Sequence, residues 1–110
     1  MKTYLVTNRA PRDFKASPEA FVAWNAWFDE LGESLVERGN PTFATKEVGN
    51  CGPETALGGY SLIQAPDLEA AIALVKTHPL TTRGGGVEVG ELTILNSGRE
   101  LITKPARRTG

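Results

Sequence analysis

Residues 58–95 read GGYSLIQAPDLEAAIALVKTHPLTTRGGGVEVGELTIL, and this stretch decides the fold. Residues 60–65 form a nearly unbroken run of apolar and β-favouring types, which predicts a strand covered on both faces. Residues 67–77 have the spacing of an amphipathic helix, and a short glycine loop leads into a second strand pattern at residues 87–95. The order of strand, helix and strand is that of one crossover unit.

Local signals mark both ends of the helix in this unit. Asp67 can accept hydrogen bonds from the free N–H groups of the first turn, so it is the predicted cap. Pro79 disfavours α geometry in the residue before it, so the helix should end near His78. The predicted buried stripe consists of Leu68, Ala71, Ile72 and Val75.

The first half of the chain repeats this order. Residues 2–8 suit a strand, and residues 17–19 form a helix start with a hydroxyl cap, a proline and a carboxylate. The apolar residues that follow recur at steps of three and four: Phe21, Trp24, Phe28, Leu31 and Leu35. This stripe predicts an amphipathic helix of about twenty residues that ends at Gly39. Residues 42–48 are then the candidate for the second strand.

The element order βαββαβ predicts an α+β, ferredoxin-like domain, in which a four-stranded antiparallel sheet carries both helices on one face. We expect residues 1–96 to form this single domain and residues 97–110 to form a loosely ordered basic tail. The strands at 60–65 and 87–95 carry apolar groups on both faces, although the helices can cover only one. The bare face therefore predicts a homodimer in which two sheets close against each other.

Composition excludes several classes of partner. The 110 residues include 12 basic and 13 acidic side chains, which give a formal net charge of -1. A chain of this balance lacks the positive surface that phosphate-backbone binders need, so we expect no nucleic-acid partner. The apolar run at residues 4–6 is too short for a signal segment or a membrane span, so we expect no membrane partner. A single cysteine fits a reducing compartment, and we expect a cytoplasmic protein.

Short motifs, most of them rich in glycine, lie along residues 2–95: Gly52-Pro53, Gly58-Gly59-Tyr60, the helix start at 67–71, the helix end before Pro79, and Gly86-Val87-Glu88-Val89. Together they resemble the YCII-related family, in particular its branch named for an Asp-Gly-Pro-Phe motif. The resemblance implies a dimeric α/β barrel, in agreement with the dimer expected from the bare sheet face. It implies no particular reaction.

The chain departs from that family in two places. The Asp-Gly-Pro-Phe motif reads CGPE here, at residues 51–54. Better-characterised relatives pair a histidine on the first helix with an aspartate directly before the proline that ends the second helix. This chain has Trp27 or Phe28 near the first position and His78 at the second, so the pair does not carry over. The resemblance therefore transfers no catalytic residue.

Two residues are candidates for catalysis. His78 is the only histidine, and its unperturbed pKa near neutral pH suits proton transfer. The alternative is a structural imidazole at a helix end, where it donates to free carbonyls. Glu88 alternates with Val87 and Val89, so it faces the barrel interior if the valines face the helices. The alternative is a solvated strand end.

Four residues are candidates for ligand binding: Tyr4, Trp27, Cys51 and Tyr60. The aromatic ones can line a pocket between helix and sheet, with Trp27 on the shoulder of the helix stripe. Cys51 precedes a Gly-Pro turn and is either a nucleophile or a spectator thiol. One histidine and one cysteine provide no metal-ligand spacing, and the glycines at 84–86 lead into a strand rather than a helix. We expect neither a metal nor another cofactor.

The leading hypothesis is a homodimeric YCII-like protein that binds a small organic molecule between the sheet and the first helix. One alternative is a cofactor-free isomerase, lyase or oxygenase that uses His78 with Glu88 or Tyr60 as acid and base. Another is a non-catalytic interaction module.

Overall fold

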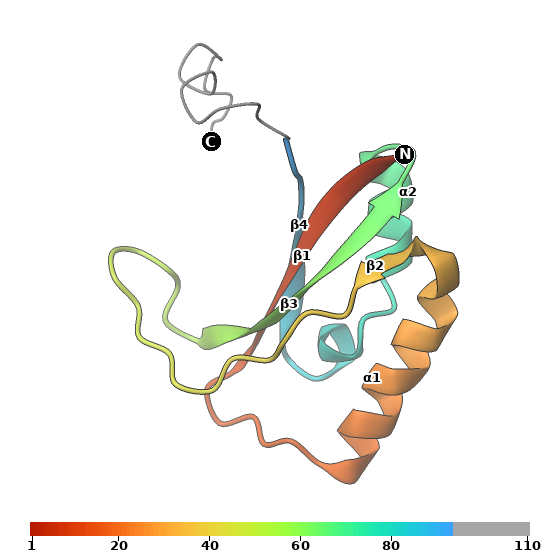
Figure 1. Ribbon diagram of the computed structural model, residues 1–110. Helices are drawn as coiled ribbons and strands as arrows, with labels where there is room; N and C mark the ends of the chain where they lie inside the picture. Colours follow the sequence, from red (N-terminus) through yellow and green to blue (C-terminus); the bar gives the residue numbers. More distant parts are fainter. Residues whose placement is uncertain (94–110) are drawn as a thin grey trace.

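The computed structural model describes residues 1–93 and shows an antiparallel sheet with two α-helices on one face (Figure 1). The elements in chain order are β1 (Lys2–Pro11), α1 (Pro18–Leu31), the 3₁₀ helix η1 (Gly32–Ser34), β2 (Leu35–Glu37), β3 (Thr55–Ala65), α2 (Leu68–Val75), the 3₁₀ helix η2 (Pro79–Thr82) and β4 (Gly86–Glu91). The strands are ordered β2-β3-β1-β4, and all neighbouring pairs are antiparallel. The predicted α+β class is confirmed, and the arrangement is compatible with a ferredoxin-like fold.

Both α-helices begin at the caps that the sequence predicts. The Ser17 Oγ accepts a hydrogen bond from the backbone N–H of Ala20 at 3.1 Å. The Asp67 Oδ1 accepts one from the N–H of Ala70 at 2.9 Å. Each cap satisfies a donor that the first helical turn leaves free, which stabilises a helix by about 1 kcal/mol. The helix starts can therefore be traced to single side chains.

The second strand lies earlier in the chain than predicted. The helix α1 ends at Leu31, because Gly32 adopts a φ of +54° and leaves the helical path. The strand β2 begins at Leu35, which pairs with β3. The predicted helix end at Gly39 and the predicted strand at 42–48 are therefore wrong. The position of Leu35 in the sequence is compatible with either a helix or a strand. The positive φ of Gly32 ends the helix before Leu35, which is therefore free to join the sheet.

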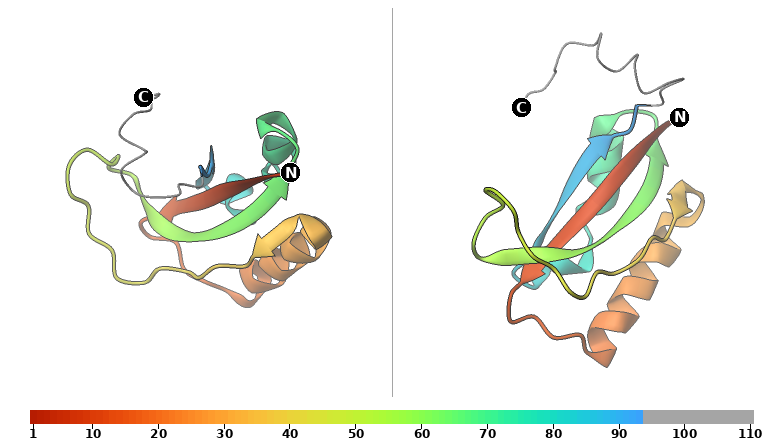
Figure 2. Two further views of the ribbon diagram at one scale, coloured as in Figure 1. Left: turned by 45° about the horizontal axis from the view of Figure 1, so that its top comes forward. Right: turned by 60° about the vertical axis from the view of Figure 1, so that its left-hand side comes forward.

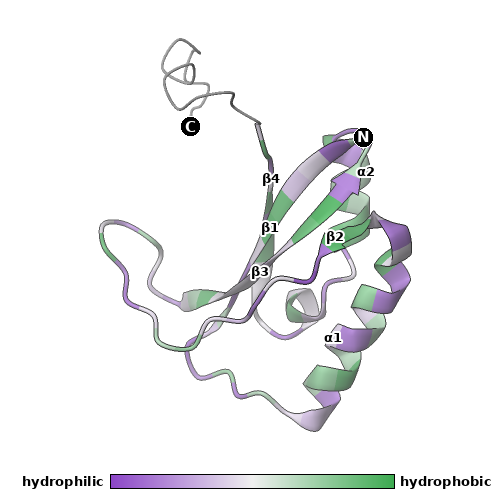
Figure 3. Cartoon of the chain, viewed as in Figure 1, coloured by the Kyte–Doolittle hydropathy of each residue, from purple (hydrophilic) through white to green (hydrophobic). Residues whose placement is uncertain are grey.

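The core lies between the two helices and the covered face of the sheet. Alternate residues of the two central strands point into it: Tyr4, Val6, Ile63 and Ala65. The helices contribute Trp27, Phe28, Leu31, Ala71 and Val75. Figure 3 shows the matching alternation of hydrophobic and hydrophilic residues along α1. The apolar residues that alternate along the strands thus pack against the apolar face of the helices in one hydrophobic layer.

The buried face of α1 is rotated from the predicted one. Trp27 is only 2% exposed, whereas Phe21, which was predicted to be in the stripe, is 72% exposed. The Trp27 Nε1 donates a hydrogen bond to the carbonyl of Leu74 at 3.2 Å, so this indole joins α1 to α2. Contacts with Phe28 and with His78, at centroid distances of 5.3 and 4.7 Å, hold the same indole in the core.

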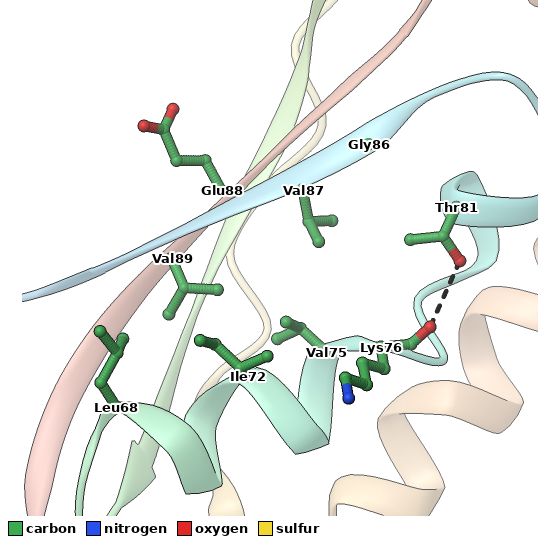
Figure 4. Close-up of a pocket in the computed structure, with 9 residues that line it drawn as sticks. All are labelled: Leu68, Ile72, Val75, Lys76, Thr81, Gly86, Val87, Glu88 and Val89. Atoms are coloured by element: carbon green, nitrogen blue, oxygen red, sulfur yellow. Dashed lines mark hydrogen bonds between the residues drawn. The ribbon is translucent and has the colours of Figure 1, made fainter.

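A groove of about 570 Å³ lies between α2 and β4 (Figure 4). Leu68 and Ile72, both predicted to be buried, remain 47% and 39% exposed beside it. Figure 4 shows Val87 and Val89 pointing toward α2 and Glu88 pointing away from it. The alternation predicted for the last strand is therefore confirmed.

The end of the chain is only partly covered by the structure. Residues 94 and 95 of the predicted last strand, and the predicted tail at 97–110, lie outside the described residues. Across residues 1–93, no helix combines the length and the apolar character needed to cross a bilayer.

Candidate functional site

A cavity of about 710 Å³ lies between one side of α1, the adjoining parts of β1 and β3, and residues 38–45. Pockets that hold small organic ligands have volumes of roughly 300–1,000 Å³, so the cavity has a suitable size. It lies between the sheet and the first helix, where the sequence leads us to expect a pocket.

Residues 38–45, which we call the strap, close one side of this cavity. Figure 2 shows the connection from β2 to β3, which includes the strap, running along one end of the sheet. Gly39 has a φ of +74°, and a Cβ there would collide with the carbonyl oxygen of Tyr60. Thr42 donates from its backbone N–H to the carbonyl of Gly58 at 3.1 Å, and from its Oγ1 to a second β3 carbonyl at 2.7 Å. The absence of a side chain at Gly39 therefore lets the strap approach β3 closely enough for these hydrogen bonds to form.

Aromatic side chains form much of the cavity wall: Phe14, Trp24, Phe28 and Tyr60. Two further lining residues, Phe21 of α1 and Phe43 of the strap, are 72% and 92% exposed. Large apolar side chains that gather at one hollow without being covered are typical of a binding surface. The wall suits a planar apolar molecule.

Asn8 brings an unsatisfied polar group to the cavity wall. Its side chain is 5% exposed, and its Oδ1 has no hydrogen-bond partner within the described residues. A Cβ on Gly58 would collide with this oxygen, so the glycine makes room for it. An unpaired buried acceptor costs about 1–3 kcal/mol, which a donor on a ligand would remove.

The charged residues of the wall are both arginines. The guanidinium of Arg12 forms an ion pair with Glu47 at 3.0 Å, and this hydrogen bond lowers the pKa of the Glu47 carboxyl. The Arg38 Nη2 donates to the Oδ1 of Asn25 at 2.9 Å, and its Cζ lies 4.3 Å from the ring centroid of Phe28. Within residues 1–93, no aspartate or glutamate lines the cavity. The wall is therefore positive.

His78 lies in the core, outside the set of residues that line the cavity. It is 1% exposed, and its Nδ1 accepts a hydrogen bond from the N–H of Leu80 at 3.0 Å, which caps η2. Its ring contacts those of Trp24 and Trp27 edge to face, at centroid distances of 5.1 and 4.7 Å. Burial lowers the pKa of His78 from 6.5 to about 4. The imidazole is therefore neutral near neutral pH, with its proton on Nε2.

This placement differs from both readings of the sequence. The structural alternative had His78 donate to the carbonyls of a helix end, whereas it accepts from the start of the next helix. Its Nε2 is buried and has no hydrogen-bond partner within the described residues. Trp27, a candidate for ligand binding, lies with it in the core.

The structure does not bring the predicted catalytic residues together. Glu88 is exposed on the sheet face that the helices leave open, whereas His78 is buried beneath the other face. Cys51 is exposed in the β2–β3 connection and does not line the cavity. Tyr4 is fully buried in the core, and burial raises the pKa of its phenol. Of the four ligand-binding candidates, Tyr60 lines the cavity.

The wall residues that were not recognised from the sequence include Asn8, Arg38 and Phe43. Asn8 ends the predicted first strand, where a polar residue needs no further explanation. Arg38 belongs to the predicted helix and Phe43 to the predicted second strand, so neither was expected at a pocket. The one local signal is Gly39, whose positive φ redirects the chain between them.

No group of three or more histidine, cysteine, aspartate or glutamate side chains is placed to hold a metal ion in the part of the chain that the structure describes. Comparisons with protein-family models, with curated proteins and with solved structures found no match.

Proposed function

We propose that this protein binds a small organic molecule in the cavity between α1 and the sheet. The observation that carries the proposal is a hollow of about 710 Å³ with aromatic walls and one unpaired buried amide oxygen, that of Asn8. Such a combination of apolar wall and few polar groups is typical of ligand pockets.

The wall favours binding over acid–base catalysis. Among the described residues that line it there is no histidine, aspartate, glutamate, lysine or cysteine, and these side chains are the usual general acids and bases. His78 is separated from the cavity by its burial in the core. The enzyme hypothesis that pairs His78 with Glu88 or Tyr60 has no support in this geometry.

Filling the cavity is expected to weaken the binding of a neutral apolar dye. Ala20 of α1 is 4% exposed and lines the cavity, so Ala20→Phe places a phenyl ring in it. We expect phenylnaphthylamine to bind the natural protein saturably, with increased fluorescence, and to bind this variant at least about tenfold more weakly.

The matched control is Ala26→Phe, which adds the same ring to an exposed position of the same helix. It should bind the dye as the natural protein does. Equal dye binding by the natural protein and Ala20→Phe, with circular dichroism confirming that both are folded, would contradict the proposal.

We further propose that two copies of this YCII-like chain associate in the cytoplasm through the open face of the sheet. Leu5 and Leu62 are paired across β1 and β3, alternate with the core residues, and are only partly buried. Covering them would remove apolar surface from water. This proposal also agrees with the resemblance of residues 2–95 to a family of dimeric barrels.

Introducing a charge into this face is expected to dissociate the dimer. Leu62→Lys would bury an ammonium group between the sheets, so the dissociation constant should rise at least about tenfold. Analytical ultracentrifugation measures the change, and Ile72→Lys, on the exposed part of α2, is the control. Sedimentation of the natural protein as a monomer at micromolar concentration would rule out the dimer.

A further inference from the structure

We propose that the cavity selects a small organic carboxylate with a planar apolar body and one O–H or N–H donor, and that Arg38 anchors the carboxylate. The inference rests on the proposed binding function and specifies the class of ligand. It follows from the charges of the wall, the position of Arg38 and the unpaired oxygen of Asn8.

The charge of the wall favours an anion. Its two charged side chains among the described residues are arginines, and Glu47 already forms an ion pair with Arg12 at 3.0 Å. Arg38 has no carboxylate within 4.0 Å in the part of the chain that the structure describes. A ligand carboxylate would supply the missing counter-charge.

The guanidinium of Arg38 is held in place by neutral groups. One of its nitrogens donates to the side-chain oxygen of Asn25 at 2.9 Å, and its plane lies over the ring of Phe28, 4.3 Å from the centroid. These contacts orient the group and leave further N–H donors free. A planar guanidinium presents paired N–H donors that match the two oxygens of a carboxylate.

Asn8 defines the other end of the ligand. Arg38 is exposed to solvent, whereas Asn8 is 5% exposed and its Oδ1 lacks a donor within the described residues. A carboxylate at the open side would remain partly hydrated. A hydroxyl or N–H group at the inner end would pair with the amide oxygen, which is covered in the structure and has to turn toward the ligand. The aromatic rings of Trp24 and Phe28 would cover the body between them.

Displacement of bound phenylnaphthylamine by matched probes tests the inference. The probes are the meta and para isomers of hydroxybenzoate, the corresponding neutral hydroxybenzamides, and benzoate, which lacks the hydroxyl donor. We expect the hydroxybenzoates to compete at least about tenfold better than the amides, because charge-assisted hydrogen bonds are the stronger ones. Benzoate, which cannot donate a hydrogen bond to Asn8, should displace the dye less well than the hydroxybenzoates do.

Two variants assign the effect to residues. In Arg38→Gln the hydroxybenzoates and the hydroxybenzamides should compete equally with the dye. Arg83 does not line the cavity, so Arg83→Gln should still prefer the hydroxybenzoates. In Asn8→Leu the advantage of hydroxybenzoate over benzoate should disappear. Because the main comparison is between probes on the natural protein, it does not depend on the folding of any variant.

The outcomes separate this inference from the proposed function. Equal competition by acids and amides, or displacement by neither up to millimolar concentration, overturns the inference while leaving dye binding in the cavity intact. Dye binding that Ala20→Phe does not change overturns the proposed function itself. Loss of acid preference in Arg83→Gln would also overturn the role given to Arg38.

Discussion

Trp27→Ala is expected to destabilise the protein by about 3–5 kcal/mol, the usual cost of removing a buried tryptophan. The indole is 2% exposed, packs against Phe28 at a centroid distance of 5.3 Å and against His78 at 4.7 Å, and donates to the carbonyl of Leu74. Its removal would leave both a cavity and an unpaired carbonyl. Single domains have a total free energy of unfolding of about 5–15 kcal/mol, so the variant should lose a large part of its stability.

Urea denaturation followed by circular dichroism measures this loss without depending on tryptophan fluorescence. Trp24→Ala is the matched control, since this indole lies on the same helix but is only partly buried and lines the cavity. It should cost clearly less stability than Trp27→Ala. An equal or larger loss in Trp24→Ala would show that Trp27 is not the centre of the core.

Acidification from about pH 7 to about pH 5 is expected to lower the free energy of unfolding by about 2 kcal/mol through His78 alone. The folded protein holds this imidazole neutral, with its pKa lowered to about 4, whereas the unfolded chain takes up a proton near 6.5. Above 6.5 the two states bind the same number of protons, so the contribution is fully present. It is lost as the pH falls from 6.5 toward 4, to a total of roughly 3 kcal/mol.

His78→Asn provides the comparison for this pH dependence. Asparagine is a good capping residue and can accept the hydrogen bond from Leu80, but it does not titrate. Urea denaturation at a series of pH values should therefore give a shallower loss of stability for the variant between about pH 6.5 and pH 5. Parallel curves for the two proteins would show that the folded state tolerates a charged imidazole at this position.

Three of the four strands and both helix starts could be predicted from the sequence because their signals are local. The caps at Ser17 and Asp67 need only a side chain and an N–H three residues ahead, and both are found as predicted. Alternation along β1 and β3 needs only the pleat of a strand. The length of α1 could not be predicted, because Gly32 is compatible with a helix until its backbone turns to positive φ.

The site was harder to predict, because its parts come together only through tertiary structure. A pocket near the first helix and one of its residues, Tyr60, were expected. Arg38 and Phe43 reach the same cavity through the strap, which depends on the close approach of Gly39 to β3. His78 drew attention as the only histidine, yet its contacts with two indoles depend on residues of α1 that are distant in sequence.

The seating of the strap has a consequence for the residence time of a bound molecule. The strap is joined to β3 through a few backbone and hydroxyl hydrogen bonds, among them those of Thr42, whereas β3 pairs with β1 along its whole length. Opening the strap requires breaking only these few bonds, while the sheet stays intact. We therefore expect that loss of the Thr42 hydrogen bonds shortens the residence time of a bound molecule without global unfolding.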